Sequence, residues 1–421
     1  MNAPGAQAGG PRAQPPQAAG AAAHDRYATR GDLVLALNCG SSSIKFALFE
    51  AGAGEPARRP AWNGKVQGIG GENPDFGETG VAPFPIRLGT DNPYGCALDL
   101  ILRRVRDRLG ERRLAAVAHR VVHGGSKYFS PVRIDAGVLA DLRSYIPLAP
   151  LHQPFALEAI DILLREQPGL PQVACFDTAF HHTVPQVEQM LPLPYDAWER
   201  GLRRYGFHGL SYEYLSIALP ERHGDLARGR VIAAHLGSGA SLCAMRESRS
   251  QATTMGFSAL DGLMMGTRTG SLDPGAVIYL MEIERLSLEE VGRILYHESG
   301  LKGVSGISPD PRDLLAVEAR EPRARLALDL YVRRIVREIG ALAAVLGGLD
   351  MLVFTAGIGE HNIELRRRIC EGLGWLGVAL DPAANAAQAT TLSLPGSTVR
   401  VAMEPTNEEW IAARHALGLP G

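Results

Sequence analysis

The stretch Leu33–Phe49, LVLALNCGSSSIKFALF, predicts a buried strand, a tight turn and a second strand. Its first five residues are apolar and Asn38 closes them, whereas apolar side chains alternate along the second strand. In the turn, Gly40 permits a left-handed or closely approached backbone, and Ser41–Ser43 offer hydroxyls beside free backbone N–H groups. Such a turn can wrap an anionic phosphate, with Lys45 adding positive charge. An ordinary polar hairpin turn is the alternative.

Composition narrows the class of protein. The chain has 421 residues, 46% of them hydrophobic, and a formal net charge of −2. This length suits two domains with substantial cores. A nucleic-acid-binding protein would normally carry a basic excess, and no run approaches the roughly 18 apolar residues of a membrane span, so neither class is expected. The five cysteines are odd in number and lack metal-type spacing, which favours a reducing, cytoplasmic location.

The first part of the chain, residues 1–31, consists mainly of Ala, Pro, Gly and Gln. Such a segment cannot bury enough apolar surface to fold, so we expect a disordered tail. It has no apolar core of the kind that secretory signals carry.

Two charged residues stand at the ends of apolar strands. Arg120 lies near the end of the strand predicted over 114–122, just before Gly124-Gly125, where the backbone could open onto a ligand. An arginine that reaches out to solvent is the alternative. Asp177 follows the apolar run Val173–Phe176, at the end that faces the ligand crevice in parallel α/β sheets. It could equally cap the following helix.

A second strand–turn–strand unit appears about two hundred residues after the first. Two apolar strands flank the turn HLGSGA at 235–240, which suggests a duplicated architecture with one phosphate turn per half. The following loop, 262–270, holds Arg268 between glycines. Small residues let a backbone and a bidentate guanidinium approach an anion together. A glycine-rich surface loop is the alternative.

Three further stretches carry polar groups between predicted elements. His208 lies in the glycine-bracketed YGFHG at 205–209, where a structural histidine is the alternative. A glycine turn at 355–360 joins a strand to a helix predicted at about Ile363, which favours nucleotide binding. In the segment 405–409, Thr406 or Asn407 could cap the last helix.

These pieces predict a phosphoryl-transfer cleft between two halves. The sequence contains no GxxxxGK[ST] motif and no HRD–DFG pair, which excludes P-loop kinases and protein kinases. What it contains is two Gly/Ser hairpins, a glycine turn before a helix, two glycine-framed arginines and an aspartate at a strand end.

From about Leu33 to Ala412 the chain resembles the acetate kinase family, of the superfamily that sugar kinases, actin and heat-shock chaperones share. The motifs that carry the resemblance are LNCGSSSIKF, HRVVHGG, PLHQP, FDTAFHHTVP, YGFHG, HLGSGAS, GLMMGTRTG, FTAGIGE and PTNEE. The implied fold is α/β, of the actin and sugar-kinase (ribonuclease H-like) type, with a mixed five-stranded sheet in each of two domains. The expected division is 32–178 plus 410–421 for the acyl and phosphate domain, and 179–409 for the nucleotide-binding domain.

The resemblance also implies roles for particular residues. The implied catalytic residues are Asp177, Arg120, His208 and Arg268, with Arg120 also holding the substrate carboxylate. The implied walls of the methyl pocket are Val122, Leu151 and Phe207. The implied nucleotide-binding residues are Lys45, His235, Leu236, Gly237, Ser238, Gly239, Asp310, Pro311, Arg312, Gly357, Ile358, Gly359, Glu360 and His361. The implied Mg²⁺ residues, with Mn²⁺ as an alternative ion, are Asn38 and Glu408.

Several positions depart from the family pattern. Ser238, Gln153, His361 and Ser271 replace residues of the family's motifs, and we expect each to remove or shorten a hydrogen-bonding group near the nucleotide or phosphoryl site. Leu210 and Tyr212 alter the motif after His208. Ala259 replaces a proline beside the acyl pocket. None touches the principal charged set, so these changes bear on substrate range and nucleotide affinity.

The expected function is reversible transfer of the γ-phosphoryl group of ATP to acetate, giving acetyl phosphate and ADP. The same reaction on propionate or butyrate is one alternative. A non-enzymatic, actin- or chaperone-like ATP-binding module is another, although such a module would have no reason to frame Arg120 and Arg268 on either side of an apolar wall. The family also implies a homodimer, and no nucleic-acid or membrane partner is expected.

Overall fold

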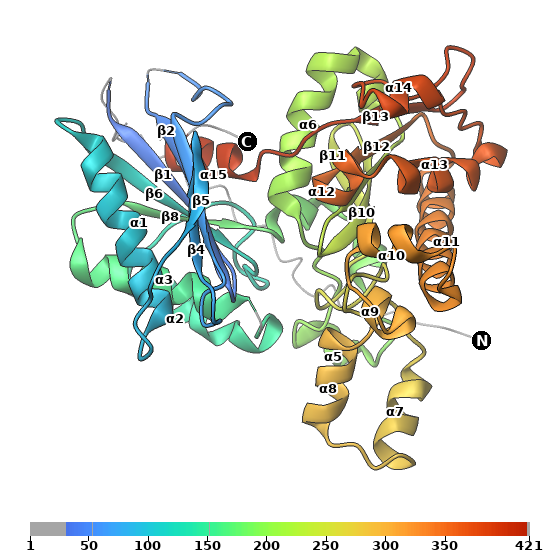
Figure 1. Cartoon of the computed structure of the whole chain (residues 1–421), viewed down its shortest axis with the longest axis horizontal. Helices are drawn as coiled ribbons and strands as arrows, with labels where there is room; N and C mark the ends of the chain where they lie inside the picture. The colour runs from blue at the N-terminus through green and yellow to red at the C-terminus, as the bar shows by residue number, and fades with distance from the viewer. Residues whose placement is uncertain (1–30, 53, 151, 419–421) are drawn as a thin grey trace, which may run out of the picture.

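The computed structural model describes residues 31–52, 54–150 and 152–418. They form two lobes, each built on one β-sheet (Figure 1). Apart from Gly31, the tail predicted over residues 1–31 lies outside the described residues. Within the described ranges, no helix is both long enough and apolar enough to cross a membrane.

The first sheet has eight strands within the described residues, in the order β5-β4-β3-β2-β1-β6-β8-β7. Strands β1, β6 and β8 run parallel, and the other neighbouring pairs are antiparallel. The strands are β1 Leu33–Cys39, β2 Ser43–Glu50, β3 Trp62–Gln67, β4 Asp75–Glu78, β5 Val81–Pro85, β6 Leu114–Val121, β7 Val132–Arg133 and β8 Gln172–Phe176.

The second sheet has five described strands, in the order β11-β10-β9-β12-β13. Two antiparallel pairs are followed by two parallel pairs, which is also the pattern of β3-β2-β1-β6-β8 in the first sheet. The duplicated architecture predicted from the two hairpins is therefore confirmed. The strands are β9 Val231–Leu236, β10 Ala240–Arg246, β11 Arg249–Thr253, β12 Met351–Thr355 and β13 Arg400–Met403.

The expectation of five strands per sheet is wrong for the first sheet. The polar passage after the opening hairpin, residues 51–93, contributes β3, β4 and β5, and the short β7 adds to the other edge. Strands β4 and β5 are short edge strands with little buried apolar pattern, so hydrophobic alternation could not reveal them.

Helices cover both faces of each sheet. Those of the first lobe are α1 Pro93–Leu109, α2 Ala136–Ser144 and α3 Gln153–Glu166, and the last helix, α15 Glu408–Ala416, packs on β1 and β6. The longer helices of the second lobe are α6 Gly209–His223, α7 Pro274–Glu282, α8 Leu288–His297, α11 Pro322–Leu346 and α13 Ile363–Glu371. The shorter ones are α4 Gln186–Gln189, α5 Tyr195–Glu199, α9 Gly300–Ser305, α10 Pro311–Val317, α12 Ala356–His361 and α14 Pro382–Ala386. Short 3₁₀ turns lie at Ile146–Leu148, Ala179–Thr183, Gly224–Arg228 and Gly374–Leu376.

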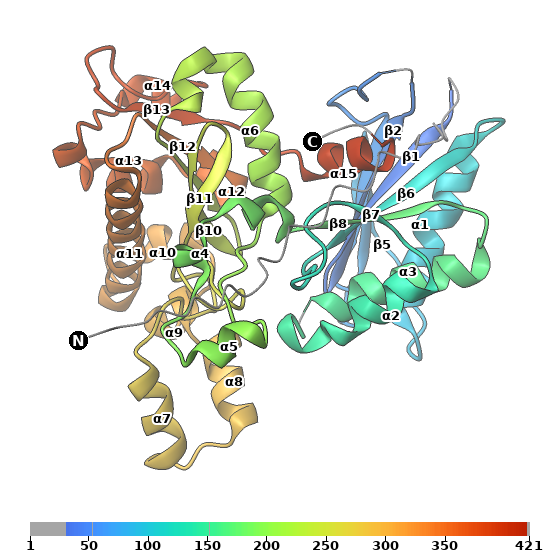
Figure 2. The same ribbon diagram turned by 180° about the vertical axis from the view of Figure 1, so that it is seen from behind.

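One long helix predicted over 275–298 is in fact two, α7 and α8, separated by a turn. Ser287 caps α8 with a capping box, in which its side chain and that of Glu290 each bind the other residue's backbone. The two helices extend away from both sheets at the end of the second lobe (Figures 1 and 2).

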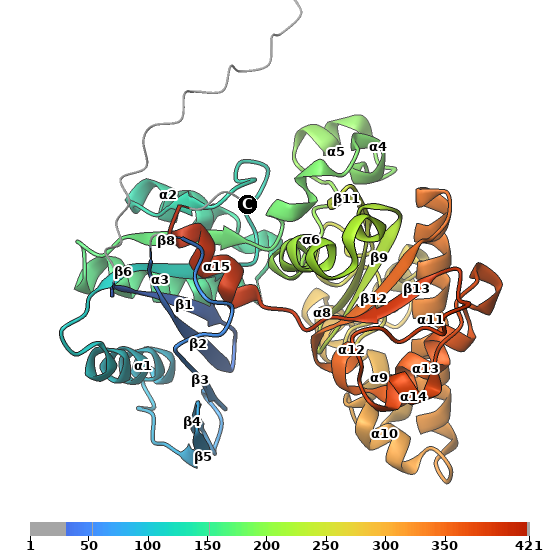
Figure 3. The ribbon, with the colours of Figure 1, turned by 90° about the horizontal axis from the view of Figure 1, so that it is seen from above.

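The alternation of side chains along β1 explains the layering. Leu33, Leu35 and Leu37 pack with α1 and α3 on one face, whereas Val34 and Ala36 pack with α15 and α6 on the other. That second cluster also contains residues of the second sheet, so α6 and α15 form a shared layer between the two sheets (Figure 3).

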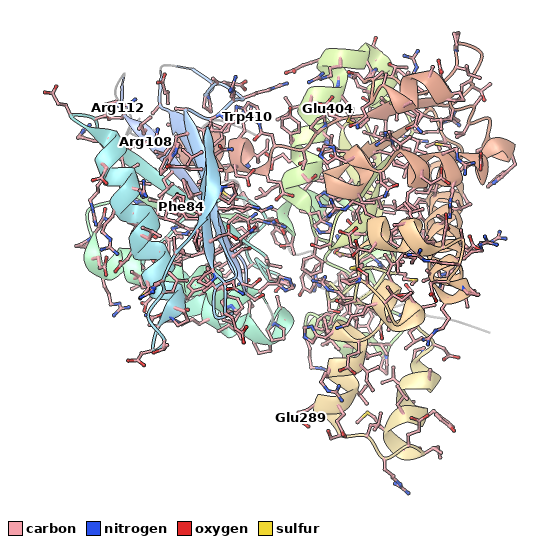
Figure 4. All side chains as sticks on the ribbon, viewed as in Figure 1. Phe84, Arg108, Arg112, Glu289, Glu404 and Trp410 are labelled. Atoms are coloured by element: carbon pink, nitrogen blue, oxygen red, sulfur yellow. The ribbon has the colours of Figure 1, made fainter. Side chains whose placement is uncertain are left out.

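The chain crosses between lobes just before the last helix. In Figure 4, Glu404 lies against the second lobe and Trp410 against the first. Asn407 caps α15 by accepting a hydrogen bond from the N–H of Trp410 at 3.1 Å, so the capping interpretation of this segment is correct. The crossing brings Glu408, at the first turn of α15, to the ends of β1 and β6. The division into domains at residues 178 and 409 stays a prediction.

Candidate active site

A cavity of about 630 Å³ lies where the strand ends of the two sheets meet. Both hairpin turns reach it: Gly40 and Ser43 from the first, and Gly237–Gly239 from the second. In the first turn, the N–H of Gly40 donates to the carbonyl of Ser43 at 2.8 Å, which closes the loop between β1 and β2. The remaining lining residues are Asn38, Cys39, Lys45, Arg120, Val122, His152, Asp177, Phe207, His208, His235, Met255, Ala259, Arg268, Ala356, Gly357, Glu360, Thr406, Glu408 and Glu409.

Arg120 is held by two carboxylates from different parts of the chain. Its Nε donates to Oδ1 of Asp177 at 2.9 Å, its Nη2 to Oδ2 of the same residue at 2.7 Å, and its Nη1 to Glu408 at 3.0 Å. Burial by itself lowers the pKa of Arg120, but the two carboxylates outweigh it and raise the pKa, so the group stays charged. Since a guanidinium has five N–H groups, two remain for a ligand.

Asp177 is therefore not a helix cap. It lies at the end of β8, its side chain is almost wholly buried, and the carboxylate faces Arg120 rather than a backbone N–H. Its own backbone carbonyl accepts from the N–H of Gly209, which links the end of β8 to the start of α6.

Arg268 differs from Arg120 because no carboxylate of the described residues forms an ion pair with it. Its Nη1 donates to the carbonyl of Ala259 at 3.1 Å, and its Nη2 lies 3.3 Å from Nε2 of His152. Burial lowers the pKa of Arg268, yet a guanidinium remains protonated in proteins. A buried positive charge without an anionic partner is costly, so this end of the cavity favours an anion.

His208 and His235 stack face to face above the second turn. Their ring centroids lie 4.1 Å apart with planes 14° from parallel. Nδ1 of His208 is bonded to Ser241 at 2.8 Å, and Nδ1 of His235 to Ser211 at 2.9 Å. Burial and nearby cations lower the pKa of both rings, that of His235 to about 3, so both are neutral near pH 7.

The second turn brings His208 and Arg268 together. A Cβ atom at Gly239 would lie 3.2 Å from Nε2 of His208 and 3.8 Å from Nη1 of Arg268, so glycine leaves room for both side chains. His208 itself has a positive φ of 59°, an uncommon conformation for a residue with a side chain. Strain of this kind is typical of residues that a functional site must orient.

An apolar wall lies beside the charged groups. Phe207 is buried, Val122 and Ala259 pack against its cluster, and all three line the cavity together with Met255. Leu151, the third predicted wall residue, lies outside the described residues. A small anion with a short apolar end thus meets cations and apolar surface in the same cavity.

The predicted nucleotide-binding residues are only partly brought together. Lys45, His235, Gly237, Ser238, Gly239, Gly357 and Glu360 line the cavity, whereas Leu236, Asp310, Pro311, Arg312, Ile358, Gly359 and His361 do not. Leu236 packs into the core, and Asp310 caps α10 while pairing with the exposed Arg312. The role of these seven residues in nucleotide binding stays a prediction.

The predicted metal residues offer suitable donors. Asn38 and Glu408 share the cavity end with Asp177 and Glu409, so an amide oxygen and three carboxylates lie there. Mg²⁺ prefers such oxygen ligands and is commonly held by one or two carboxylates, waters and substrate phosphates. The described residues contain no group of three or more His, Cys, Asp or Glu arranged for a metal, and a Mg²⁺ ion that arrives with a nucleotide needs none.

Sequence reasoning did not assign a role to His152 or to the residues behind the two stacked histidines. His152 lines the cavity, and burial together with Arg268 and Arg120 lowers its pKa to about 4. Tyr212 bonds Ser241 at 2.6 Å and so completes the support of His208. The PLHQP motif pointed to His152, but no periodicity distinguishes the supporting hydroxyl groups from ordinary core residues.

Two of the departures from the family pattern lie elsewhere than expected. Gln153 is fully buried and binds the backbone of His123, so it does not face the nucleotide or phosphoryl site. Ser271 accepts from the N–H of Gly262 at 3.1 Å and donates to Asp261 at 2.7 Å, which closes the glycine-framed loop around Arg268. Both residues support loops instead of contacting a ligand.

Two lobes of one topology, with two cations, a strand-end aspartate and an apolar wall between them, define a kinase of the actin and sugar-kinase fold type. A family model described as the Acetokinase family matches residues 33–414. An acetate kinase from Rhodopseudomonas palustris is 50% identical over 390 residues, which are 91% of this chain and 97% of that protein. The chain therefore belongs to the acetokinase family, whose reaction transfers a phosphoryl group to a carboxylate.

Solved structures agree with this assignment. The acetate kinase of Porphyromonas gingivalis has a TM-score of 0.82 at 36% identity, covering 92% of this chain and 99% of that one. A propionate kinase from Francisella tularensis has a TM-score of 0.83 at 32% identity, covering 92% of this chain and 100% of that one. The expected fold class and enzyme class are thereby confirmed.

Proposed function

We propose that this chain is an acetate kinase, which transfers the γ-phosphoryl group of ATP reversibly to acetate to give acetyl phosphate and ADP. The observation that carries the proposal is the pairing of a buried, unmatched Arg268 with an apolar wall in one cavity. The names of the similar acetate kinases support the choice of acetate.

The chemistry needs little acid–base assistance. A carboxylate oxygen attacks the γ-phosphorus while the bond to the β-phosphate oxygen breaks, and the electron pair leaves with ADP. The difficulty is to bring two anions together and to stabilise a loose, metaphosphate-like transition state. We assign Arg268 and His208 to the equatorial oxygens of the transferring group, since both reach the second turn at Gly239.

The proposed carboxylate site is at Arg120, with Val122 and Phe207 along the methyl group. The two N–H groups that Asp177 and Glu408 leave unused can reach the substrate carboxylate. Asp177 then acts by holding the guanidinium in place. This assignment explains why a strand-end aspartate lies buried against an arginine.

The proposed nucleotide site runs from the second turn to the start of α12, over Gly237–Gly239 and Gly357. Lys45 lies on the same side. Asn38 and Glu408 would hold Mg²⁺, or Mn²⁺ in its place. A bound divalent ion would neutralise phosphate charge, and the residues listed here orient the groups that it meets.

Hydroxylamine trapping tests the proposal. Purified protein is incubated with ATP, Mg²⁺ and either acetate, propionate, butyrate or no acid, and the acyl phosphate is trapped as a hydroxamate. We expect product with acetate and none without acid. ATP binding without hydroxamate from any acid would instead favour the non-enzymatic ATP-binding module.

Propionate kinase activity is the second candidate function. Ala259 lines the cavity beside Phe207, where a proline would present more carbon surface and a fixed φ. The similarity to a propionate kinase adds weight to this candidate. The trapping assay distinguishes the two by the relative kcat/KM for acetate and propionate.

We further propose a homodimer in the cytoplasm. Helix α7 buries none of its residues, and Ile278, Tyr279, Ile283 and Leu288 of the α7–α8 projection are 53–69% exposed. Exposed apolar groups gathered on one projection are typical of an interface. All five cysteines are free, which suits a reducing compartment. Sedimentation at several concentrations tests the dimer, and Ile283→Asp should shift it towards monomer.

A further inference from the structure

His123 lies directly behind the apolar wall of the cavity. It is fully buried, and its ring meets that of Tyr205 at 4.4 Å and that of Phe207 at 5.7 Å between centroids, both nearly edge-on. Phe207 lines the cavity, as does Val122, which precedes His123 in the chain. His123 itself does not line it. The ring therefore supports the wall from the protein side.

The position of His123 is held by three hydrogen bonds around its own backbone and ring. Its Nδ1 accepts from the N–H of Gly125 at 2.8 Å. The side chain of Gln153 accepts from the N–H of His123 at 3.1 Å and donates to its carbonyl at 3.0 Å. Because Gln153 binds both backbone groups, the peptide that joins His123 to Val122 is held as well.

The ring of His123 contributes volume and not charge. An Nδ1 that accepts a hydrogen bond leaves the proton of the neutral ring on Nε2. Burial lowers the pKa of His123 to about 4, so the ring is neutral near pH 7. A neutral ring without access to the cavity cannot exchange protons with the substrate.

The contact joins two segments that each carry a proposed functional group. His123 follows Arg120 in the loop after β6, and Phe207 precedes His208 at the start of α6. In a close-packed interior, a change in one side chain is passed to the side chains that touch it. The size of the ring at position 123 thus determines how far Phe207 lies from the opposite wall at Val122 and Ala259.

We infer that His123 is a positioning residue that sets the depth of the acyl pocket through Phe207. The inference rests on the proposed carboxylate kinase activity and on Phe207 as its pocket wall. Removing the ring should let Phe207 withdraw and admit one more methylene of the substrate.

The test measures kcat/KM for acetate and for propionate in the wild-type protein and in His123→Ala. One buried methylene corresponds to about a fourfold preference, so the propionate-to-acetate ratio should rise by about 3- to 10-fold in the variant. The KM for ATP should stay within about twofold. In His123→Phe, which keeps a ring against Phe207, the ratio should remain at or below the wild-type value.

His119 provides a matched control. It lies on β6 of the same motif, is buried, and has its pKa lowered to about 4 by burial. Its Nε2 is bonded to Gln172 at 2.8 Å, and it contacts neither Tyr205 nor Phe207 in the manner of His123. His119→Ala should lower stability to a similar extent and leave the propionate-to-acetate ratio unchanged.

An unchanged ratio in a folded His123→Ala would overturn the inference, as would an equal shift in His119→Ala. If His123→Ala does not fold, His123→Leu is measured in its place, with a smaller rise in the same direction expected. Wild-type protein that phosphorylates neither acid would refute the proposed function, and the pocket with it. A wild-type protein active on acetate, with variants of unaltered ratio, would refute the inference alone.

Discussion

The two glycine-framed arginines of the cleft occupy opposite electrostatic environments. Arg120, at the end of β6 in the first lobe, is bonded to Asp177 and Glu408. Arg268, in the loop of the second lobe, is bonded to a carbonyl and a histidine instead. The pKa of Arg120 is raised by its carboxylates, against the effect of burial, whereas burial lowers that of Arg268.

This difference separates structure from catalysis. A buried cation that is already neutralised by two carboxylates is part of the folded framework, and only its spare N–H groups serve a ligand. A buried cation without a counter-charge is stabilised most when an anion arrives, so it can respond to charge that develops during the reaction. We therefore expect the two residues to differ when each is replaced.

The largest expected effect is on the turnover of Arg268→Ala. Removing this cation should lower kcat by about 10² to 10⁴, because the transferring phosphoryl group loses a charge that no neighbour replaces. The melting temperature should stay near that of the wild type, since no ion pair is broken. Steady-state kinetics and circular dichroism measure both.

Arg268→Lys serves as the control for charge without the planar fork, and its activity should lie between those of the other two forms. Near-wild-type activity in a folded Arg268→Ala would remove Arg268 from the mechanism.

Arg120→Ala should also lose most turnover, with a larger rise in the KM for the carboxylate than Arg268→Ala shows. The sharper contrast concerns stability. Without Arg120, Asp177 and Glu408 are left as unpaired charges, and breaking such a pair costs about 3 kcal/mol even at the lower end of the usual range. Urea denaturation of the two variants measures this difference. Equal stability of the two would contradict the framework role of Arg120.

Glu408→Ala and Asp177→Asn test whether the two carboxylates on Arg120 have separate tasks. If Glu408 orients Mg²⁺, raised Mg²⁺ should restore part of the activity of Glu408→Ala. Asp177→Asn should not be restored, because it fails to hold the arginine and not the ion. Both variants are titrated with Mg²⁺ at saturating ATP. The division of tasks fails if the two respond alike.

The smallest expected effect concerns Ala259, whose carbonyl accepts the hydrogen bond from Arg268. Proline at this position would fill space beside Phe207, so Ala259→Pro should favour acetate over propionate more strongly than the wild type does. One methylene corresponds to about 0.8 kcal/mol, or about fourfold in the ratio of kcat/KM. A ratio that is unchanged, or that moves towards propionate, would show that the loop had collapsed onto the space.

Local patterns were enough to predict the framework of the site. Alternating apolar residues and a Gly/Ser turn predicted each hairpin, and the repetition of that unit predicted two lobes of the same kind. An apolar run followed by Arg120, and another followed by Asp177, placed both residues at strand ends. These features depend on neighbours in the chain, so the order of residues carries them.

The edge of the first sheet and the support of the histidines could not be predicted in this way. Strands β4 and β5 lack a buried face, and the hydroxyl of Ser241 that holds His208 lies on a different element from it. The resemblance to a family supplied the roles of several residues, but it placed Gln153 near the phosphoryl site when the residue is in fact buried beneath His123.

The amino-acid sequence by itself determined the elements, their repetition and the residue types that meet a phosphate and a carboxylate, because each follows from local periodicity and turn chemistry. Only the tertiary structure decided which charges neutralise one another. Glu408 comes from the last helix and Arg120 from an early strand, and they meet because the chain crosses back to the first lobe at its end. Arg268 remains unpaired because no described carboxylate is folded against it, and this difference in partners cannot be read from two similar glycine-framed motifs.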